Sequence, residues 1–186
     1  MSKQIRISSE NAEKYFFLEC LVPEKLPTSF KCAIQEYNDY LFNDAIRSYN
    51  DHIAKTWLLL EYSTGQIAAY MSLIADAIKL SATEKELHSL NYPFKTIPAV
   101  KIAKLAVSQS FTERYKGIGS FMIEVAISKA IGCNTDYCAA RFLTVDADIE
   151  HDKGVTAFYE KNTFISNLEL LNKNRKTISM RKDIYL

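Results

Sequence analysis

The chain has 186 residues, of which 48% are hydrophobic and 24% charged, and its formal net charge is +1. This length suits one domain whose core needs no metal or disulfide support. The composition excludes an intrinsically disordered chain, and the near-neutral charge argues against a broad basic surface for nucleic acid.

Targeting signals and metal motifs are absent from the sequence. It has no N-terminal apolar segment typical of an export signal and no apolar run long enough to span a bilayer. The four cysteines lack the paired spacing of a zinc site and lie among apolar or aromatic neighbours: Cys20, Cys32, Cys133 and Cys138. We therefore predict a reduced, cytoplasmic protein with no metal and no membrane partner.

The first half of the chain is predicted to contain three strands and two helical regions. The strands are expected at residues 3–8, 57–62 and 67–74, and the helical regions at residues 12–21 and 30–52. Pro23 would stop the first helix, and Gly65 would supply the turn of a hairpin between the second and third strands. The tyrosine-rich face of residues 30–52 is best interpreted as a helix face packed on a sheet.

Residues 81–98 form an excursion longer than a simple connection needs. Ser81 and Glu84 have the spacing of a capping box, which predicts a helix through about Leu90. A proline-punctuated loop then runs to Pro98. A solvated insertion is the favoured interpretation, with a lid or a partner surface as the alternative.

The stretch from Ile102 to Ile131 is the most informative part of the chain. Ile102–Val107 has the length of a buried strand, and after a polar loop a long apolar helix begins near Gly117 and Gly119. The first N–H groups of a helix have no intrahelical partner, and glycines let a ligand approach them closely. This arrangement predicts an anion-binding site at the start of the helix.

The remaining residues predict a strand, a helix and two final strands. The strand is expected at residues 142–147, the helix at 156–164 and the final strands at 165–170 and 177–181. The C-terminal segment is locally basic and is expected to be a solvated hairpin, with the following cations: Lys173, Arg175, Lys176, Arg181 and Lys182.

Two motifs in this half of the chain resemble the GNAT acyltransferase superfamily. Arg114, Gly117 and Gly119 fill the fixed positions of its acyl-CoA-binding motif, Q/R-x-x-G-x-G/A. Downstream, residues 156–164 resemble its F-Y-E-K-x-G-F signature, with Thr163 in place of the glycine. The loop between the preceding strand and the first motif is also longer than usual for the family.

The resemblance implies a single GNAT-like domain over residues 1–186 with an α/β fold of the α+β type. Its central sheet would be mixed and mostly antiparallel, with helices flanking it. The fourth and fifth strands, Ile102–Val107 and Phe142–Ala147, would splay apart so that the pantetheine arm of acyl-CoA lies between them.

The resemblance also implies acetyl-CoA as cosubstrate, and a site for it. Backbone groups of Leu105, Ala106 and Val107 would line the pantetheine arm, and the loop and helix start would hold the pyrophosphate. The residues implied there are Arg114, Tyr115, Lys116, Gly117, Ile118, Gly119 and Ser120.

Two groups are implied for the chemistry. The Val107 N–H would stabilise the oxyanion formed when an amine attacks the thioester. Tyr159 would protonate the departing sulfur as general acid. No motif supports a general base, for which the candidates by position are Glu61, Asp146, Asp148 and His151.

Three interpretations of the acceptor remain open. The first is an N-acetyltransferase acting on the primary amine of a small molecule or protein. The second is a toxin of the type that acetylates the amino group of aminoacyl-tRNA, for which the C-terminal cations are the only candidate footprint. The third is an acyl-CoA-binding module without turnover. A homodimer is a further expectation, since dimers are common among resembling proteins.

Overall fold

The computed structural model describes residues 4–167 and 176–186. The chain forms two compact units. Unit 1 comprises Met1–Ile74 and Ala103–Val125, and unit 2 comprises Ala75–Ile102 and Ala126–Leu186.

Nine strands and several helices are described. The strands are β1 (Ile5–Arg6), β2 (Phe16–Cys20), β3 (Lys55–Glu61), β4 (Ile67–Lys79), β5 (Thr96–Val107), β6 (Tyr115–Lys116), β7 (Phe142–Asp148), β8 (Ile165–Ser166) and β9 (Thr177–Asp183). The helices are α1 (Gln35–Asp39), α2 (Ala45–Asn50), α3 (Ala82–Leu87), α4 (Gln109–Thr112), α5 (Ile118–Asp136) and α6 (Val155–Lys161), with a 3-10 turn η1 (Ala12–Lys14) and a π-helical turn η2 (Tyr40–Asp44).

Seven of these strands form one sheet in the order β2-β3-β4-β5-β7-β9-β8. β5 and β7 are parallel, whereas the pairs β2–β3, β3–β4, β7–β9 and β8–β9 are antiparallel. The predicted mixed, mostly antiparallel sheet is therefore confirmed. The parallel pairs run from Ala99↔Phe142 to Ile102↔Val145, and the splay expected beyond them stays a prediction.

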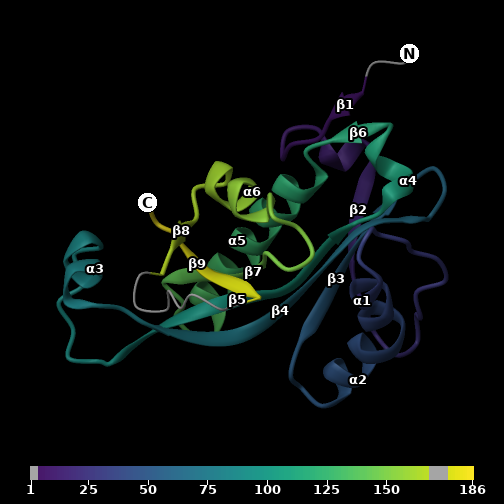
Figure 1. Ribbon diagram of the computed structural model, residues 1–186. Helices are drawn as coiled ribbons and strands as arrows, with labels where there is room; N and C mark the ends of the chain where they lie inside the picture. Colours follow the sequence, from purple (N-terminus) through teal and green to yellow (C-terminus); the bar gives the residue numbers. More distant parts are fainter. Residues whose placement is uncertain (1–3, 168–175) are drawn as a thin grey trace. The chain divides into compact units, whose positions relative to one another are not determined.

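Unit 1 contains the predicted hairpin of β3 and β4, with Gly65 at φ 67° in its turn. Both strands are rich in apolar residues, and α1 and α2 lie beside β3 (Figure 1). Tyr70 and Leu41 are fully buried in the core between these helices and the hairpin. The helical prediction for residues 30–52 is confirmed from Gln35 onward.

The helix predicted at residues 12–21 is wrong. Only Ala12–Lys14 form a 3-10 turn, and Phe16–Cys20 form β2, which pairs with β3 from Phe16↔Glu61 to Cys20↔Trp57. A free sheet edge on β3 gives these residues backbone partners that a short isolated helix lacks. The propensity of the segment is overridden by this non-local pairing.

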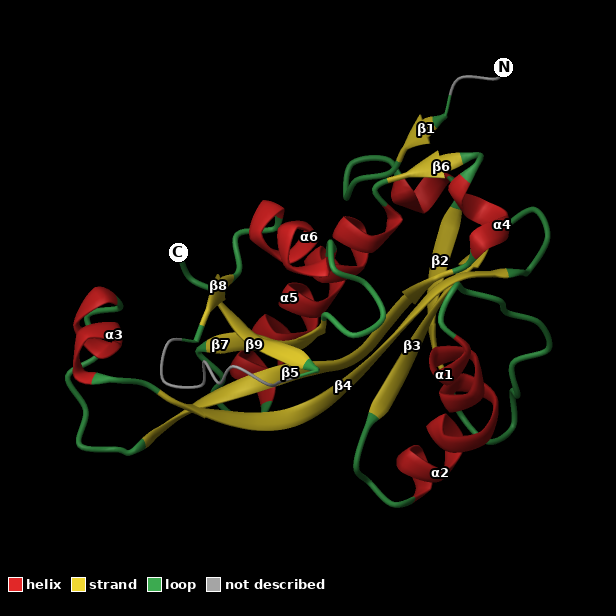
Figure 2. Cartoon of the chain, in the orientation of Figure 1, coloured by secondary structure: helices red, strands yellow, loops and turns green. Residues whose placement is uncertain are grey.

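The strand predicted at the N-terminus exists but does not enter the main sheet. β1 pairs in parallel with β6, with Ile5 opposite Tyr115 and Arg6 opposite Lys116 (Figure 2). The N-terminal segment therefore contacts the loop that the sequence singles out.

Unit 2 contains the excursion at residues 81–98, which Figure 2 shows beyond the ends of β4 and β5. The capping box of Ser81 and Glu84 is confirmed, and the helix ends at Leu87. The excursion is anchored by buried Glu84 and His88, while several large apolar side chains are exposed: Leu87, Tyr92 and Phe94. The expectation of a merely solvated insertion is thus only partly correct.

Arg181 contradicts the expectation of a solvated basic hairpin, because it is only 1% exposed. Its Nη1 donates to Glu84 Oε1 at 2.7 Å and to Asn167 Oδ1 at 2.7 Å. A guanidinium buried to this degree needs such partners. Lys173 and Arg175 lie outside the described residues.

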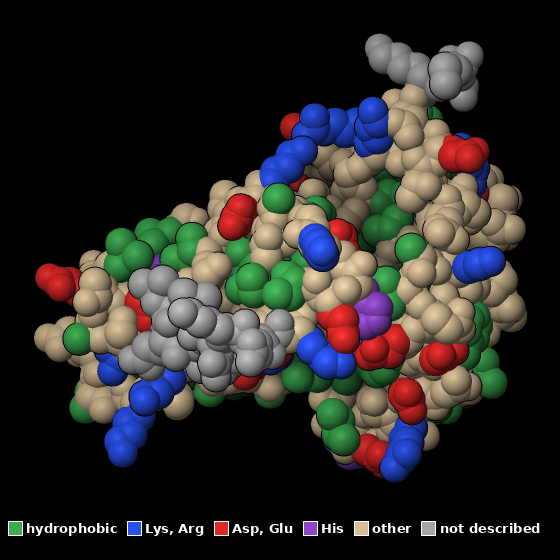
Figure 3. Space-filling view, in the orientation of Figure 1, with side chains coloured by type: hydrophobic (Ala, Val, Ile, Leu, Met, Phe, Trp, Pro, Cys, Tyr) green, Lys and Arg blue, Asp and Glu red, His purple; other side chains and the backbone are tan. Residues whose placement is uncertain are grey.

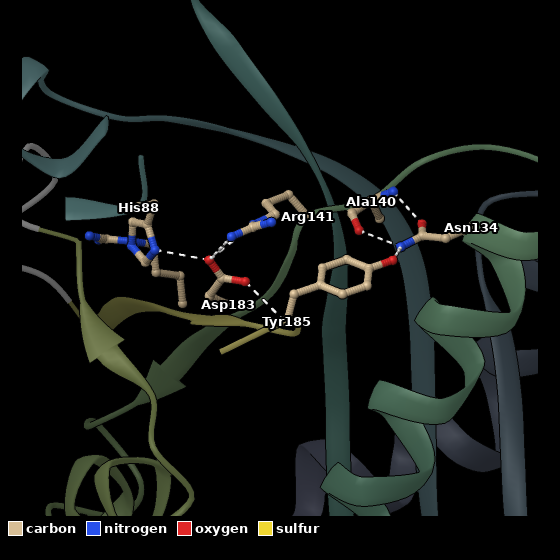
Figure 4. Close-up of polar contacts among 7 residues, drawn as sticks. His88, Asn134, Ala140, Arg141, Asp183 and Tyr185 are labelled. Carbon is tan, nitrogen blue, oxygen red and sulfur yellow. Dashed lines mark hydrogen bonds and ion pairs between the residues drawn. The ribbon is translucent and has the colours of Figure 1, made fainter. Parts of the chain in front are cut away.

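A polar network continues from Arg181 through His88 to Asp183 and Arg141 (Figure 4). Asp183 accepts from Arg141 Nη2 at 2.8 Å and lies 3.0 Å from His88 Nδ1. Because Arg181 Nε donates to His88 Nε2, we assign the His88 proton to Nδ1, which then donates to Asp183. The last strand and the excursion are thereby joined through buried charges.

Candidate functional site

The end of β5 presents backbone groups away from β4. The Ser108 N–H donates to Ala68 O at 2.8 Å, so the backbone groups of this residue face β4. Neighbouring residues of an extended chain point their N–H groups in opposite directions. The Val107 N–H is therefore directed away from β4, and Leu105, two residues earlier, shares that orientation.

The loop after β5 is held by backbone hydrogen bonds from two other segments. The Gln109 N–H donates to Lys31 O at 2.9 Å. From the N-terminal segment, the Ile5 and Ile7 N–H groups donate to Arg114 O and Lys116 O at 2.9 and 2.7 Å. Backbone hydrogen bonds therefore hold the segment that leads into α5 both at its start, at Gln109, and at β6.

Gly117 occupies the one position of this loop where a side chain is excluded on two grounds. Its φ is +83°, and a Cβ atom there would lie 2.7 Å from Ile7 O. Any L-residue would be strained by the dihedral and would push the N-terminal segment away. The glycine predicted from the motif thus permits both the turn and the close approach of Ile7.

Helix α5 begins immediately afterwards and runs for 19 residues. Its first amides, from Ile118, Gly119 and Ser120, have no intrahelical partner by their position. They also take part in none of the hydrogen bonds formed within the part of the chain that the structure describes. Together with the positive end of the helix dipole, these amides form a site suited to an anion.

Cations lie close to this site. Arg6 and Lys116 are exposed and occupy opposite positions of the β1–β6 pair. Figure 3 shows Lys and Arg side chains gathered near the edge where Figure 1 places β1 and β6. An anion bound at the start of α5 therefore has positive charge beside it from side chains as well as from amides.

Arg114 is arranged differently from these cations. Its Nη1 and Nη2 donate to the two oxygens of Glu61, at 2.8 and 3.3 Å. The guanidinium also lies over the Phe111 ring, 4.9 Å from its centroid. The charge of the motif arginine is therefore already paired within the protein.

Glu61 is unsuited to the role of general base. Its carboxylate is 2% exposed and accepts hydrogen bonds from Thr64, Tyr115 and Arg114. Burial opposes the charged form, but these hydrogen bonds and the Arg114 charge lower the pKa of Glu61 below its ordinary value. Burial, and then the bond to Glu61, raise the pKa of Tyr115.

The other candidate bases lie in unit 2, and each has a polar side-chain partner. Asp146 pairs with Lys101, and Asp148 Oδ2 lies 2.8 Å from His151 Nδ1. Neither pair is deeply buried, and Asp146 and His151 are exposed. None of these contacts distinguishes one of them as a base.

Tyr159, the predicted general acid, is part of α6 in unit 2. Its side chain is buried, with ring contacts to Phe158 and Phe164 at centroid distances of 5.1 and 5.3 Å. The structure thus collects the predicted cofactor residues, Leu105 to Ser120, in unit 1 and holds Tyr159 in unit 2. Bringing this hydroxyl to the reacting sulfur stays a prediction.

The described residues contain neither a cluster of metal ligands nor a helix that could span a membrane. Within residues 4–167 and 176–186, no group of three or more His, Cys, Asp or Glu side chains is arranged to hold a metal ion. None of the helices in these ranges has the length and apolar character that crossing a bilayer requires.

The sequence did not reveal two residues that shape this site. Ile7 closes the space over Gly117, and Thr64 completes the contacts of Glu61. A signal for the second was present, because a carboxylate at the end of an apolar strand needs a partner when it is buried. Ile7 carries no comparable signal, since its role depends on the pairing of β1 with β6.

No protein-family model matches the sequence, and no curated protein matches it either. Solved structures do match the fold. A mutant of the protein KacT superposes with a TM-score of 0.72 at 17% identity, over 90% of this chain and 95% of that one. AtaT complexed with acetyl-methionyl-tRNAfMet has a TM-score of 0.70 at 18% identity, over 88% and 93% of the two chains.

A third similar structure is AtaTR bound with acetyl-CoA, with a TM-score of 0.69 at 19% identity over 90% and 94% of the chains. These similarities confirm the GNAT-like fold that the two motifs predict. The structures of KacT and of the AtaT toxin include mutants in which one tyrosine is replaced by phenylalanine.

Proposed function

We propose that residues 1–186 form one domain with acetyl-CoA-dependent N-acetyltransferase activity. The observation that carries this proposal is the start of α5, where three amides that have no hydrogen-bond partner among the described residues follow Gly117 at the end of a braced loop. A pyrophosphate fits such a site by charge and by its need for several N–H donors. The fold shared with AtaTR, which was solved with acetyl-CoA, supports the same ligand.

The residues of unit 1 would bind and orient this cosubstrate, which supplies an acetyl group activated as a thioester. The amides of Ile118, Gly119 and Ser120 would hold the pyrophosphate, with Lys116 adding positive charge. The exposed edge of β5 at Leu105 and Val107 would pair with the amide groups of the pantetheine arm. Main-chain groups carry most of this binding.

Two groups would act on the reacting atoms. A neutral amine of the acceptor attacks the thioester carbon, and the Val107 N–H stabilises the negative charge that develops on the carbonyl oxygen. Tyr159 donates its hydroxyl proton to the departing sulfur. Two observations support this choice of acid. Residues 156–164 resemble the motif that carries the family's tyrosine, and structures of KacT and AtaT were solved with one tyrosine replaced by phenylalanine.

The acceptor we favour is the amino group of an aminoacyl-tRNA. The supporting observation is the AtaT complex with acetyl-methionyl-tRNAfMet, which has this fold over most of both chains. Burial of Arg181 removes one of the five cations expected to form the C-terminal footprint, and the net charge of the chain is only +1. A small-molecule or protein amine is the second candidate.

The test is transfer of radiolabelled acetyl from acetyl-CoA to total aminoacyl-tRNA, with deacylated tRNA and simple primary amines in parallel. Label in aminoacyl-tRNA alone supports the first acceptor, and label in the amines supports the second. No transfer to any acceptor, with acetyl-CoA still bound, would favour a binding module without turnover.

Tyr159→Phe separates catalysis from binding in the same assay. Losing the acid is expected to lower the rate by about 10²–10⁴-fold while the affinity for acetyl-CoA stays within about twofold. The matched control is Tyr137→Phe, because Tyr137 is 88% exposed. An unchanged rate in the Tyr159 variant would remove the hydroxyl from the mechanism.

A further inference from the structure

We propose that Glu61 is a positioning residue for the anion-binding site, and that Arg114 acts by anchoring the loop to Glu61 rather than by contacting the pyrophosphate. Only the identity of the anion rests on the proposed function. The positioning itself is a property of the protein without a ligand.

The Glu61 carboxylate is the convergence point of four hydrogen bonds. Oε1 accepts from Arg114 Nη1 at 2.8 Å and from the Tyr115 hydroxyl at 2.9 Å. Oε2 accepts from Thr64 Oγ1 at 2.8 Å and from Arg114 Nη2 at 3.3 Å. Both oxygens are thus occupied by groups from two segments, the β3–β4 turn and the loop before α5.

Glu61 itself is held rigidly by the hairpin. Its N–H donates to Gln66 O at 3.0 Å, and its carbonyl accepts from the Gly65 N–H at 2.8 Å. The carboxylate therefore extends from a fixed backbone, and Thr64 in the same turn fixes its orientation. It is a suitable anchor for the loop before α5.

The two loop residues are fixed in turn by aromatic packing. The Tyr115 ring packs against Phe16 and Tyr15, with centroid distances of 5.0 and 5.8 Å. The Arg114 guanidinium lies over Phe111. Each loop residue therefore combines an aromatic contact with a hydrogen bond to the same carboxylate.

Arg114 and Tyr115 are placed in the chain where they can set the geometry of the anion-binding amides. Arg114 and Tyr115 directly precede Lys116 and Gly117, and the amides that would bind the anion follow at once. Holding two consecutive side chains on Glu61 sets the direction in which the chain enters α5. Releasing them leaves the turn at Gly117 restrained mainly by the hydrogen bonds to Ile5 and Ile7.

A double-mutant cycle on acetyl-CoA affinity distinguishes positioning from direct contact. We expect Glu61→Gln and Arg114→Gln each to lower the affinity for acetyl-CoA about tenfold. The double variant should lose no more affinity than whichever single variant loses more. Additive losses of about a hundredfold would contradict the proposal. A gain in affinity for Glu61→Gln would also contradict it, because a released arginine would then be binding the pyrophosphate.

A second measurement uses the protein without ligand, so that it stands if acetyl-CoA does not bind at all. NMR order parameters of the Gly117 and Gly119 amides are expected to fall in Glu61→Gln and Arg114→Gln. Glu113→Gln is the matched control, since it removes an exposed carboxylate next to Arg114 and should leave these values unchanged. Unchanged order parameters in all three variants would overturn the proposal.

A milder variant guards against loss of folding. Tyr115→Phe removes one hydrogen bond to Glu61 and keeps the ring contacts. We expect about a threefold loss of acetyl-CoA affinity, together with lower order parameters at Gly117. If the folded Tyr115 variant has the wild-type values of both, the convergence on Glu61 does not position the loop.

Discussion

At the scale of single residues, Thr163 shows how this chain departs from the motif it resembles. It stands where the motif has glycine, and its φ is +66°, in the left-handed region. A β-branched residue is strained there, and the cost is about 1–3 kcal/mol. The turn after α6 keeps the glycine conformation although the glycine is missing, and Thr163 accepts a hydrogen bond from Lys182.

Thr163→Gly should therefore stabilise the protein by about 1 kcal/mol, after allowance for the greater freedom of glycine in the unfolded chain. This corresponds to a rise in Tm of about 2–4 °C for a chain of this size. The measurement is thermal unfolding followed by circular dichroism. Thr163→Ala should fall between the two, and a glycine variant less stable than the alanine variant would contradict the strain.

Glu61 predicts a pH dependence of stability. Because its folded pKa is depressed, ionised Glu61 contributes stability that is fully present above the ordinary glutamate pKa of about 4.3 and is lost as pH falls through the lower folded value. We expect the free energy of unfolding of the wild type to exceed that of Glu61→Gln by about 2–4 kcal/mol near pH 6, and the difference to shrink progressively below pH 4. Urea unfolding across pH 3–7 measures this, and a pH-independent difference would be contrary to the assignment.

These residues show what the sequence could and could not predict about the site. Gly117 was predictable, because a motif glycine at a helix start implies a backbone that excludes side chains. The pairing of Arg114 with Glu61 was not, since 53 residues separate them and only the folded sheet brings them together. The two structural reasons for Gly117, its dihedral and the nearby Ile7, likewise required the structure.

At the scale of elements, local patterns predicted well wherever the partner was near in sequence. The β3–β4 hairpin, the capping box of α3 and the long helix α5 all follow from turn, cap and apolar patterns. β2 was mistaken for a helix, because its strand character comes from pairing with β3 across a separation of 37 or more residues. The prediction that Arg181 is solvated was wrong for a similar reason, since its partner Glu84 lies 97 residues away.

The pair of Glu84 and Arg181 is expected to hold the excursion to β9. The two side chains are 4% and 2% exposed, so removing one partner leaves a buried charge. Arg181→Met should cost about 3–5 kcal/mol in unfolding free energy, and adding Glu84→Leu should recover much of that loss. Lys176→Met, which breaks an exposed pair with Glu150, should cost less than about 1 kcal/mol.

Urea unfolding of these variants measures the effect. Equal losses of unfolding free energy for Arg181→Met and Lys176→Met would show that the buried pair contributes no more to stability than the exposed pair. A double variant that is less stable than Arg181→Met would show that Glu84 is satisfied by other partners, such as the Ser81 backbone N–H.

At the scale of the whole molecule, the motifs predicted the fold correctly although overall identity to the similar solved structures is only 17–19%. The turn before α5 constrains a few residues strongly, such as Gly117, and leaves most others free to vary. The acceptor was less predictable, because surface segments recognise it. The fold does not require particular residues in such segments, so they carry no motif.

The most direct test of the proposed cofactor site is calorimetric titration of the purified protein with acetyl-CoA, beside a variant with Gly117→Val and Gly119→Val. Gly132→Ala is the control, because a Cβ there meets no atom within 4 Å. We predict micromolar binding by wild type and control, and none by the double-valine variant with its circular dichroism spectrum retained. Absence of binding to wild type, or equal binding by the double-valine variant, would contradict a cofactor site at the start of α5.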